Sequence, residues 1–77
     1  MNKQRRNVLQ ELQVKLIEAK DVLEELRDEE VDYRDNIPES LQGSERYGRA
    51  EEAADALEDA VSSLEEATES IGAAIEA

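Results

Sequence analysis

Two heptad repeats are the feature that most constrains this sequence. Apolar residues recur at alternating intervals of three and four positions, in two separate series. The first series is Leu9, Leu12, Leu16, Ala19, Leu23 and Leu26, with Tyr33 in the same register, and the second is Ala50, Ala53, Leu57, Ala60, Leu64, Ala67, Ile71 and Ala74. This spacing places apolar side chains on one face of an α-helix. The sequence therefore predicts two long helices, at about residues 4–34 and 45–76.

Composition alone would favour a disordered chain. Charged residues make up 39% of the sequence, aromatic residues only 3%, and the net charge is −12. Low hydrophobicity with high net charge is the signature of disorder. The apolar residues are periodic rather than scattered, however, so we interpret the chain as helical.

A short corner is predicted between the helices, at residues 35–44. Asn36 and Glu39 have the spacing of a capping box, and Pro38 suits the first turn of a short helix. Gly43 is expected to adopt the left-handed conformation that ends such a turn. Ser44 can then cap the second long helix.

The distribution of charge favours antiparallel helices. The first twenty residues carry five bases and two acids, whereas the chain after Arg49 carries nine acids and no base. Folding back is expected to bring Arg5 and Arg6 beside Glu69 and Glu76. Each exposed pair of this kind contributes less than about 1 kcal/mol.

The second helix has a wider apolar face than a hairpin needs. With Ala50 at heptad position a, positions e and g also hold apolar or small residues, where a simple seam would carry charge. Chains of this size usually need oligomerisation to bury enough surface. We therefore expect one all-α domain, residues 1–77, an antiparallel two-helix hairpin that dimerises into a four-helix bundle; the alternative is a monomer that tolerates this face. The predicted oligomer seam is Ala56, Leu57, Val61, Leu64, Ile71 and Ile75.

Two candidate binding surfaces follow from the same heptad positions. The acids of the second helix fall at positions b, c and f, which predicts an acidic outer face, although most such faces serve only solubility. Its candidate partner-binding residues are Glu51, Glu52, Asp55, Glu58, Asp59, Glu65, Glu66 and Glu69. On the first helix, Val14 and Ile17 form an apolar spot on the supposed solvent side. This spot is a possible docking point or an ordinary exposed pair.

Several classes of function are disfavoured. Without histidine or cysteine the chain has no imidazole base, thiol nucleophile or usual zinc ligands. Asp28, Glu30, Asp32 and Glu39 match ligand positions of a calcium loop, but Tyr33 replaces its required glycine. The acidic charge opposes direct nucleic-acid binding, and no apolar run reaches membrane length. We expect no catalytic residue, cofactor or metal site, and a cytoplasmic protein that binds itself or another protein.

The corner resembles a group of small helical-hairpin proteins. The residues concerned are Asp28-Glu29-Glu30, Tyr33, Asp35-Asn36-Ile37-Pro38-Glu39-Ser40-Leu41-Gln42, Ser44-Glu45-Arg46 and the following Glu/Ala/Leu repeat. Proteins of this group are carried by phages, prophages and mobile elements of low-GC Gram-positive bacteria. The resemblance implies a helical hairpin encoded by a small accessory gene and acting in the bacterial host cell. It implies no activity and no functional residues, and the chain departs from the group at Tyr47-Gly48-Arg49 and Ala53-Ala54.

Two functional hypotheses fit these features. In the first, an acidic phage or mobile-element protein binds and inhibits a host nucleic-acid enzyme, such as a defence nuclease, by presenting carboxylates in place of DNA phosphates. In the second, a self-associating structural or adaptor bundle scaffolds other phage proteins. The first depends on the acidic face, and the second depends on apolar surfaces.

Overall fold

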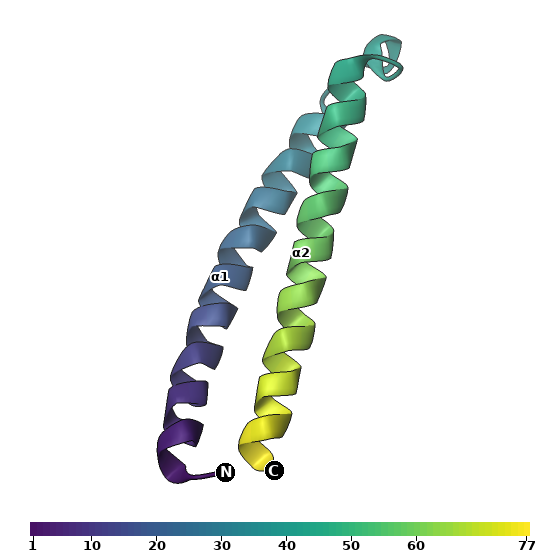
Figure 1. Cartoon of the computed structure of the whole chain (residues 1–77). Coiled ribbons are helices and arrows are strands. Elements are labelled where there is room, and N and C mark those ends of the chain that lie inside the picture. The colour runs from purple at the N-terminus through teal and green to yellow at the C-terminus, as the bar shows by residue number, and fades with distance from the viewer.

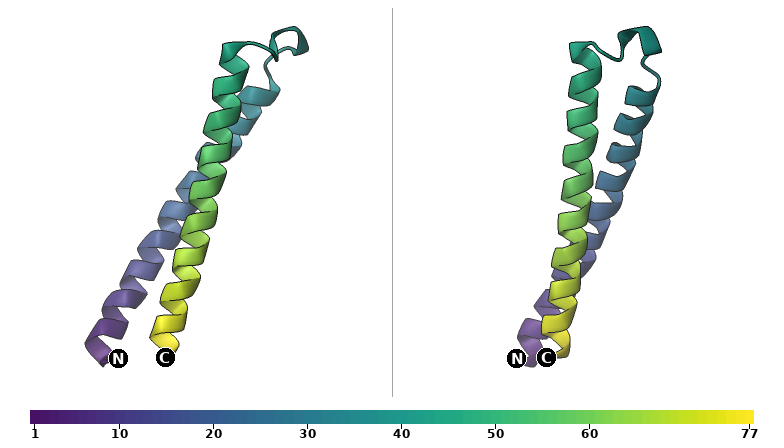
Figure 2. Two further views of the ribbon diagram at one scale, coloured as in Figure 1. Left: turned by 45° about the vertical axis from the view of Figure 1, so that its right-hand side comes forward. Right: turned by 90° about the vertical axis from the view of Figure 1, so that its right-hand side faces the viewer.

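The computed structural model describes residues 1–77 as two long helices joined by a short corner. Helix α1 spans Lys3–Asp35, a single 3-10 turn η1 spans Glu39–Leu41, and helix α2 spans Glu45–Glu76. The two helices lie side by side and antiparallel, with both termini at one end and the corner at the other (Figure 1). They cross at a shallow angle (Figure 2) and form a rod of 59 × 15 × 13 Å. The predicted helical hairpin is confirmed.

Polar side chains begin both long helices. The Asn2 carboxamide oxygen accepts a hydrogen bond from the Arg5 backbone N–H at 2.8 Å. The Ser44 hydroxyl accepts one from the Tyr47 backbone N–H at 3.3 Å, as the sequence predicted. Caps of this type stabilise a helix by about 1 kcal/mol, because they satisfy N–H groups that have no partner within the helix.

The corner closes differently from the prediction. Asn36 caps the C-terminus of α1 and forms no capping box, and Pro38 precedes η1 without a side-chain cap. Gly43 has no positive φ, so the predicted left-handed turn is wrong. The corner is held instead by the Ile37 N–H, which donates to the Arg34 carbonyl at 3.1 Å, and by the Ile37 side chain, which is only 3% exposed. Burial of one apolar side chain thus fixes the turn without special backbone geometry.

The hairpin has a thin core. Only four of its residues are buried, namely Ile37, Ala50, Ala54 and Val61. Three of the four belong to α2, and two of those are alanines, which bury little area. Neither long helix carries an apolar stretch sufficient to cross a bilayer. Most of the apolar residues that the sequence predicted to be buried are therefore only half-buried in a single chain.

The predicted seam is wrong for half of α1. Leu12, Leu26 and Tyr33 were expected in the seam, but their side chains are 42%, 45% and 44% exposed. The half-buried residues of α1 that follow the helical period are Arg6, Leu9, Gln13, Leu16, Lys20, Leu23, Arg27, Glu30 and Arg34. Helix α1 is thus rotated so that one row of leucines and one row of long polar side chains face α2. The aliphatic stems of these polar side chains cover the seam and their polar ends reach its edge. The Arg6 Nε is an exception, because it is buried without a hydrogen-bond partner.

Candidate functional site

One flank of the hairpin is a ladder of polar contacts. Every seventh residue of α1 from Arg6 to Arg34 is a long polar side chain, and every seventh residue of α2 from Glu51 to Glu65 is a glutamate. The Arg27 guanidinium donates to Glu58 Oε2 at 2.8 Å. One heptad further from the corner, Lys20 Nζ lies 3.9 Å from Glu65 Oε1. We call this flank the ladder; its α1 members are Arg6, Gln13, Lys20, Arg27 and Arg34, and its α2 members are Glu51, Glu58, Glu65 and Gly72.

One rung of the ladder is neutral on both helices. Gln13 occupies the α1 position and Gly72 the α2 position. The Gln13 amide donates to the Thr68 carbonyl at 3.2 Å, and a Cβ added to Gly72 would lie 3.2 Å from the Gln13 amide nitrogen. Because residue 72 has no side chain, the Gln13 amide can lie against the backbone of α2 at this position. Where α1 carries no positive charge, α2 carries no negative charge.

Hydrogen bonds to carboxylates raise the pKa of two arginines in the ladder. The bond to Glu58 is the main cause for the Arg27 guanidinium, and Asp28 adds to it. The bond to Asp35 is the main cause for the raised pKa of Arg34, to which the negative charge of Glu51 also contributes. Both groups remain charged throughout the neutral range, so these shifts give no pH dependence there.

The ladder ends in a backbone contact beside the termini. The Arg6 guanidinium donates to the Ala77 carbonyl at 3.2 Å. The predicted neighbours Glu69 and Glu76 form no ion pair with Arg5 or Arg6. The antiparallel arrangement inferred from charge is thus present, but its contacts form at the rungs rather than at the helix ends.

The ladder divides the predicted acidic face into two sets. Glu58 and Glu65 form ion pairs with α1, so these two acids do not face solvent alone. Glu51 forms no ion pair, but its negative charge adds to the raised pKa of Arg34. The remaining predicted residues are exposed and engage no ion pair, namely Glu52, Asp55, Asp59, Glu66 and Glu69. The acidic outer surface of α2 thus comprises five of the eight predicted residues.

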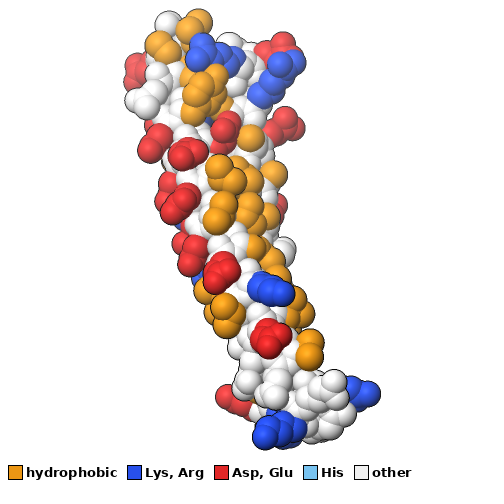
Figure 3. Space-filling view, turned by 90° about the vertical axis from the view of Figure 1, so that its left-hand side faces the viewer, with side chains coloured by type: hydrophobic (Ala, Val, Ile, Leu, Met, Phe, Trp, Pro, Cys, Tyr) orange, Lys and Arg blue, Asp and Glu red, His pale blue; other side chains and the backbone are white.

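The opposite flank of the hairpin is apolar and uncovered. It combines one side of each helix: Val8, Leu12, Ala19, Val22, Leu26 and Tyr33 of α1, all exposed, with Ala53, Ala56, Ala60, Ser63, Ala67, Ser70 and Ala74 of α2, exposed or half-buried. We call this surface the open face. Figure 3 looks onto the α1 side of the rod and shows apolar side chains gathered along its long axis, with acidic side chains beside them and charged side chains between them toward the end that holds the termini. No acidic residue interrupts its α2 half.

Contacts near the corner show that the two halves of the open face lie on one side. The Arg46 guanidinium donates to the Tyr33 hydroxyl at 2.6 Å and lies 5.2 Å from the centre of the Tyr33 ring. Tyr33, Arg46, Ala50 and Ala53 line one shallow surface hollow together. This end of the open face is therefore framed by a cation–π contact between the two helices.

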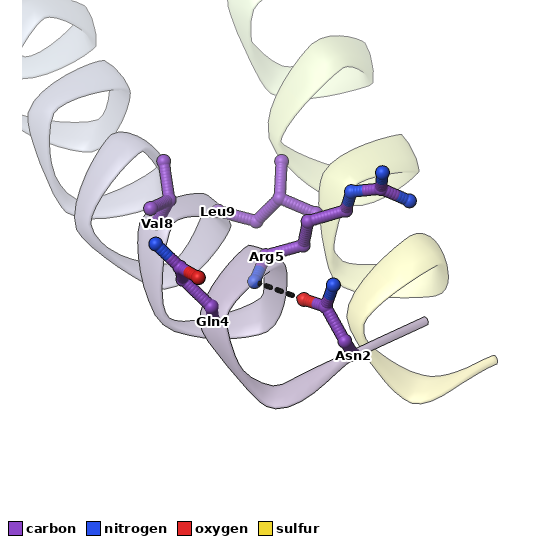
Figure 4. Close-up of a pocket in the computed structure, with 5 residues that line it drawn as sticks. All are labelled: Asn2, Gln4, Arg5, Val8 and Leu9. Atoms are coloured by element: carbon purple, nitrogen blue, oxygen red, sulfur yellow. Dashed lines mark hydrogen bonds between the residues drawn. The ribbon is translucent and has the colours of Figure 1, made fainter.

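A second shallow hollow lies at the end that holds the termini. Its lining comes from the first turns of α1: Asn2, Gln4, Arg5, Val8 and Leu9 (Figure 4). In Figure 4 the Leu9 side chain lies on the side of α1 nearer to α2. Val8, a member of the open face, is 57% exposed. Apolar surface thus remains uncovered toward both ends of the hairpin.

The predicted oligomer seam falls into three groups. Val61 is only 2% exposed and is buried within the hairpin itself, as is half-buried Ile75 in part, so these two residues offer little surface to a second chain. Ala56 lies on the open face. Half-buried Leu57, Leu64 and Ile71 form the row between the ladder side and the open face. The sequence prediction missed Leu12, Leu26 and Tyr33 as surface residues because it had already assigned them to the intrachain seam.

The predicted apolar spot on α1 is exposed but small. The side chains of Val14 and Ile17 are 56% and 41% exposed. Ile17 lines a shallow hollow with Lys20, Glu65 and other ladder-side residues. These two residues therefore lie apart from the open face.

No group of three or more acidic side chains lies close enough together to hold a metal ion. Comparisons with protein-family models, with curated proteins and with solved structures find no match to this chain. The candidate functional sites of the chain are therefore its two surfaces, the open face and the acidic outer surface.

Proposed function

We propose that this chain acts by binding proteins rather than by catalysis, and that the open face binds a second copy to make a four-helix bundle. The observation that carries this proposal is the open face itself: Leu12, Leu26 and Tyr33 lie in one apolar surface beside a row of alanines. Scattered exposed apolar residues are normal, but exposed apolar residues gathered on one face along a molecule indicate an interaction surface. The bundle then serves as a structural or adaptor unit.

The exposed area of the hairpin supports association. The chain has 5620 Å² of accessible surface, whereas a compact monomer of its mass is expected to expose about 4700 Å². The excess of roughly 900 Å² is close to the about 800 Å² that each partner buries in a standard interface. Covering the open face would thus bring the chain to the exposed area of an ordinary small domain.

Light scattering tests the self-association directly. The wild-type chain is expected to have twice the mass of the 8.6 kDa monomer. Ala60→Glu places a charge in the open face and should return the chain to monomer. Ser62→Glu adds the same side chain at an exposed position two residues away and should leave the dimer intact. A wild-type chain that is monomeric and fully helical over a wide concentration range would contradict the proposal.

A second candidate function rests on the acidic outer surface. We propose it as the surface by which a phage or mobile-element accessory protein binds the basic groove of a host nucleic-acid enzyme. Glu52, Asp55, Asp59, Glu66 and Glu69 support this candidate because they are exposed and engage no ion pair. Their charges are therefore not compensated within the chain and can act on a basic partner.

Charge removal from α2 tests this second candidate. The variant Glu52→Gln, Asp55→Asn, Asp59→Asn, Glu66→Gln should keep its fold, because none of these side chains contacts α1 in an ion pair. It should lose a basic nucleic-acid enzyme that the wild type retains from a Gram-positive host lysate at low salt. A matched control removes four exposed acids of α1, Glu11, Glu18, Asp21 and Glu25. Equal retention by wild type and by the α2 variant would show that these acids serve solubility alone.

A further inference from the structure

We propose that the two copies pack open face to open face with both corners at the same end. This inference rests on the self-association proposed above and specifies its geometry. The twofold axis then runs parallel to the long axis of the rod, and α1 of one chain lies antiparallel against α2 of the other. The alternative places the corners at opposite ends and makes α1 pack on its own copy and α2 on its own copy.

The sizes of the side chains favour the first arrangement. On the open face, α1 presents Leu12, Leu26 and Tyr33, whereas α2 presents an alanine every seven residues, namely Ala53, Ala60, Ala67 and Ala74. Rotation about the long axis leaves each residue at its own height along the rod. The heights follow from the ladder, in which residue 27 lies beside 58 and residue 20 beside 65.

Three of the four resulting levels match a large side chain to a small one, and at the fourth Ala19 meets Ala67 of the partner subunit. Tyr33 lies level with Ala53 of the partner subunit, and Leu26 with Ala60 of the partner subunit. Leu12 lies level with Ala74 of the partner subunit. Large side chains placed against alanines can interdigitate at the density of a protein interior. The opposite arrangement sets leucines against leucines on one side of the bundle and alanines against alanines on the other, so the two sides require different helix separations.

The charges of the two helices favour the same arrangement. After Ala50, α2 carries nine acids and no base, whereas α1 carries ten acids and seven bases, so α2 is the more negative helix. With the corners at opposite ends, the two α2 helices are neighbours, joined through alanines that permit a close approach. Their acids then lie within the roughly 8–10 Å over which charges act at moderate salt. With the corners together, the two α2 helices lie on the diagonal of the bundle, and each has only α1 helices as neighbours.

Cysteine cross-linking distinguishes the arrangements, because the chain has no cysteine of its own. Ala19 and Ala67 lie on the open face, and both accept cysteine with little change in volume. With the corners together, Ala19 is level with Ala67 of the partner subunit. With the corners at opposite ends, Ala19, near the middle of α1, lies beside its own copy. A disulfide forms only when the two Cα atoms are about 4.4–6.8 Å apart.

The experiment oxidises Ala19→Cys alone, Ala67→Cys alone and an equal mixture of the two variants. The expected result is a shift to twice the monomer mass on a non-reducing gel for the mixture, with mass spectrometry identifying a link between residues 19 and 67. Neither variant alone should shift, and Ser62→Cys on the outer surface is the matched control. Self-linking of Ala19→Cys, or a dimer that forms no 19–67 link, would overturn the arrangement. Light scattering that finds only monomer would instead overturn the proposed self-association.

Discussion

The seam between the two helices is covered on one flank of this hairpin and left uncovered on the other. On the ladder flank, Arg27 and Lys20 extend over the seam and end at Glu58 and Glu65, so the edge is closed within one chain. On the open face, Leu26 and Tyr33 lie beside alanines and nothing in the chain covers them. The difference teaches that long polar side chains can complete an edge between two helices, whereas short apolar ones require another helix.

The largest expected effect is the loss of the hairpin fold itself, as distinct from the loss of the dimer. Val61→Glu places a carboxylate at a position that is 2% exposed, facing α1. An unpaired buried charge costs about 3 kcal/mol or more, so we expect this variant to lose its helical circular dichroism signal. Ala56→Glu, on the exposed edge of the open face, should keep its helicity as a monomer and lose only the dimer.

Equal behaviour of these two variants would contradict the distinction between core and open face. If Val61→Glu remains helical and becomes monomeric, as Ala56→Glu should, then Val61 contacts a second chain rather than α1. If both variants unfold, the isolated hairpin has no stability apart from the dimer. Thermal melts of the two variants at matched concentrations give this result directly.

A smaller effect is expected on the ladder flank. Arg27→Glu places two carboxylates opposite each other and should lower the melting temperature slightly without changing the oligomeric mass. Adding Glu58→Arg restores the attraction with its direction reversed, so the double variant should recover the lost stability. Because the pair is exposed, the effect should shrink at high salt. A single variant that dissociates the dimer would show that the ladder also contacts the partner.

The smallest effect compares two glycines in α2. A Cβ at Gly48 would have no heavy atom within 4 Å, so Gly48→Ala should stabilise the helix by about 0.5–1 kcal/mol. At Gly72 the added Cβ would lie 3.2 Å from the Gln13 amide nitrogen, so Gly72→Ala should gain less. Urea denaturation of both variants measures the difference. An equal gain at both sites would show that the Gln13 amide moves aside at no cost.

The fold could be predicted from the sequence because heptad spacing specifies helices directly. The rotation of α1 could not be predicted in the same way. Helix α1 has adjacent apolar rows, one containing Leu9 and Leu16 and another containing Leu12 and Leu26, and either row can face a partner. The pattern gives the width of the apolar surface, but one neighbouring helix covers only part of that width.

The candidate surfaces could be predicted only in part, because the heptad pattern of one helix does not show which side chains contact the other helix. The acids of α2 were located correctly on the helix, but Glu58 and Glu65 were assigned to solvent because their partners lie in the other helix. The sequence did contain a signal, since Lys20 and Arg27 repeat at the same seven-residue interval as Glu58 and Glu65. Total charge counts do not show this match between bases and acids. It is found only when the sequences of the two helices are aligned antiparallel. The corner geometry depended on burial of Ile37, which local turn preferences do not report.

The ladder also has a consequence for the order in which the chain folds. Its contacts join residues that are 31 apart at Arg27–Glu58, 55 apart at Gln13–Thr68 and 71 apart at Arg6–Ala77. Closing a long loop in one step costs more entropy than closing it in stages, since each formed contact shortens the segment that remains. Folding is therefore expected to proceed like a zipper from the corner, and the end that holds both termini is the last to form and the first to open.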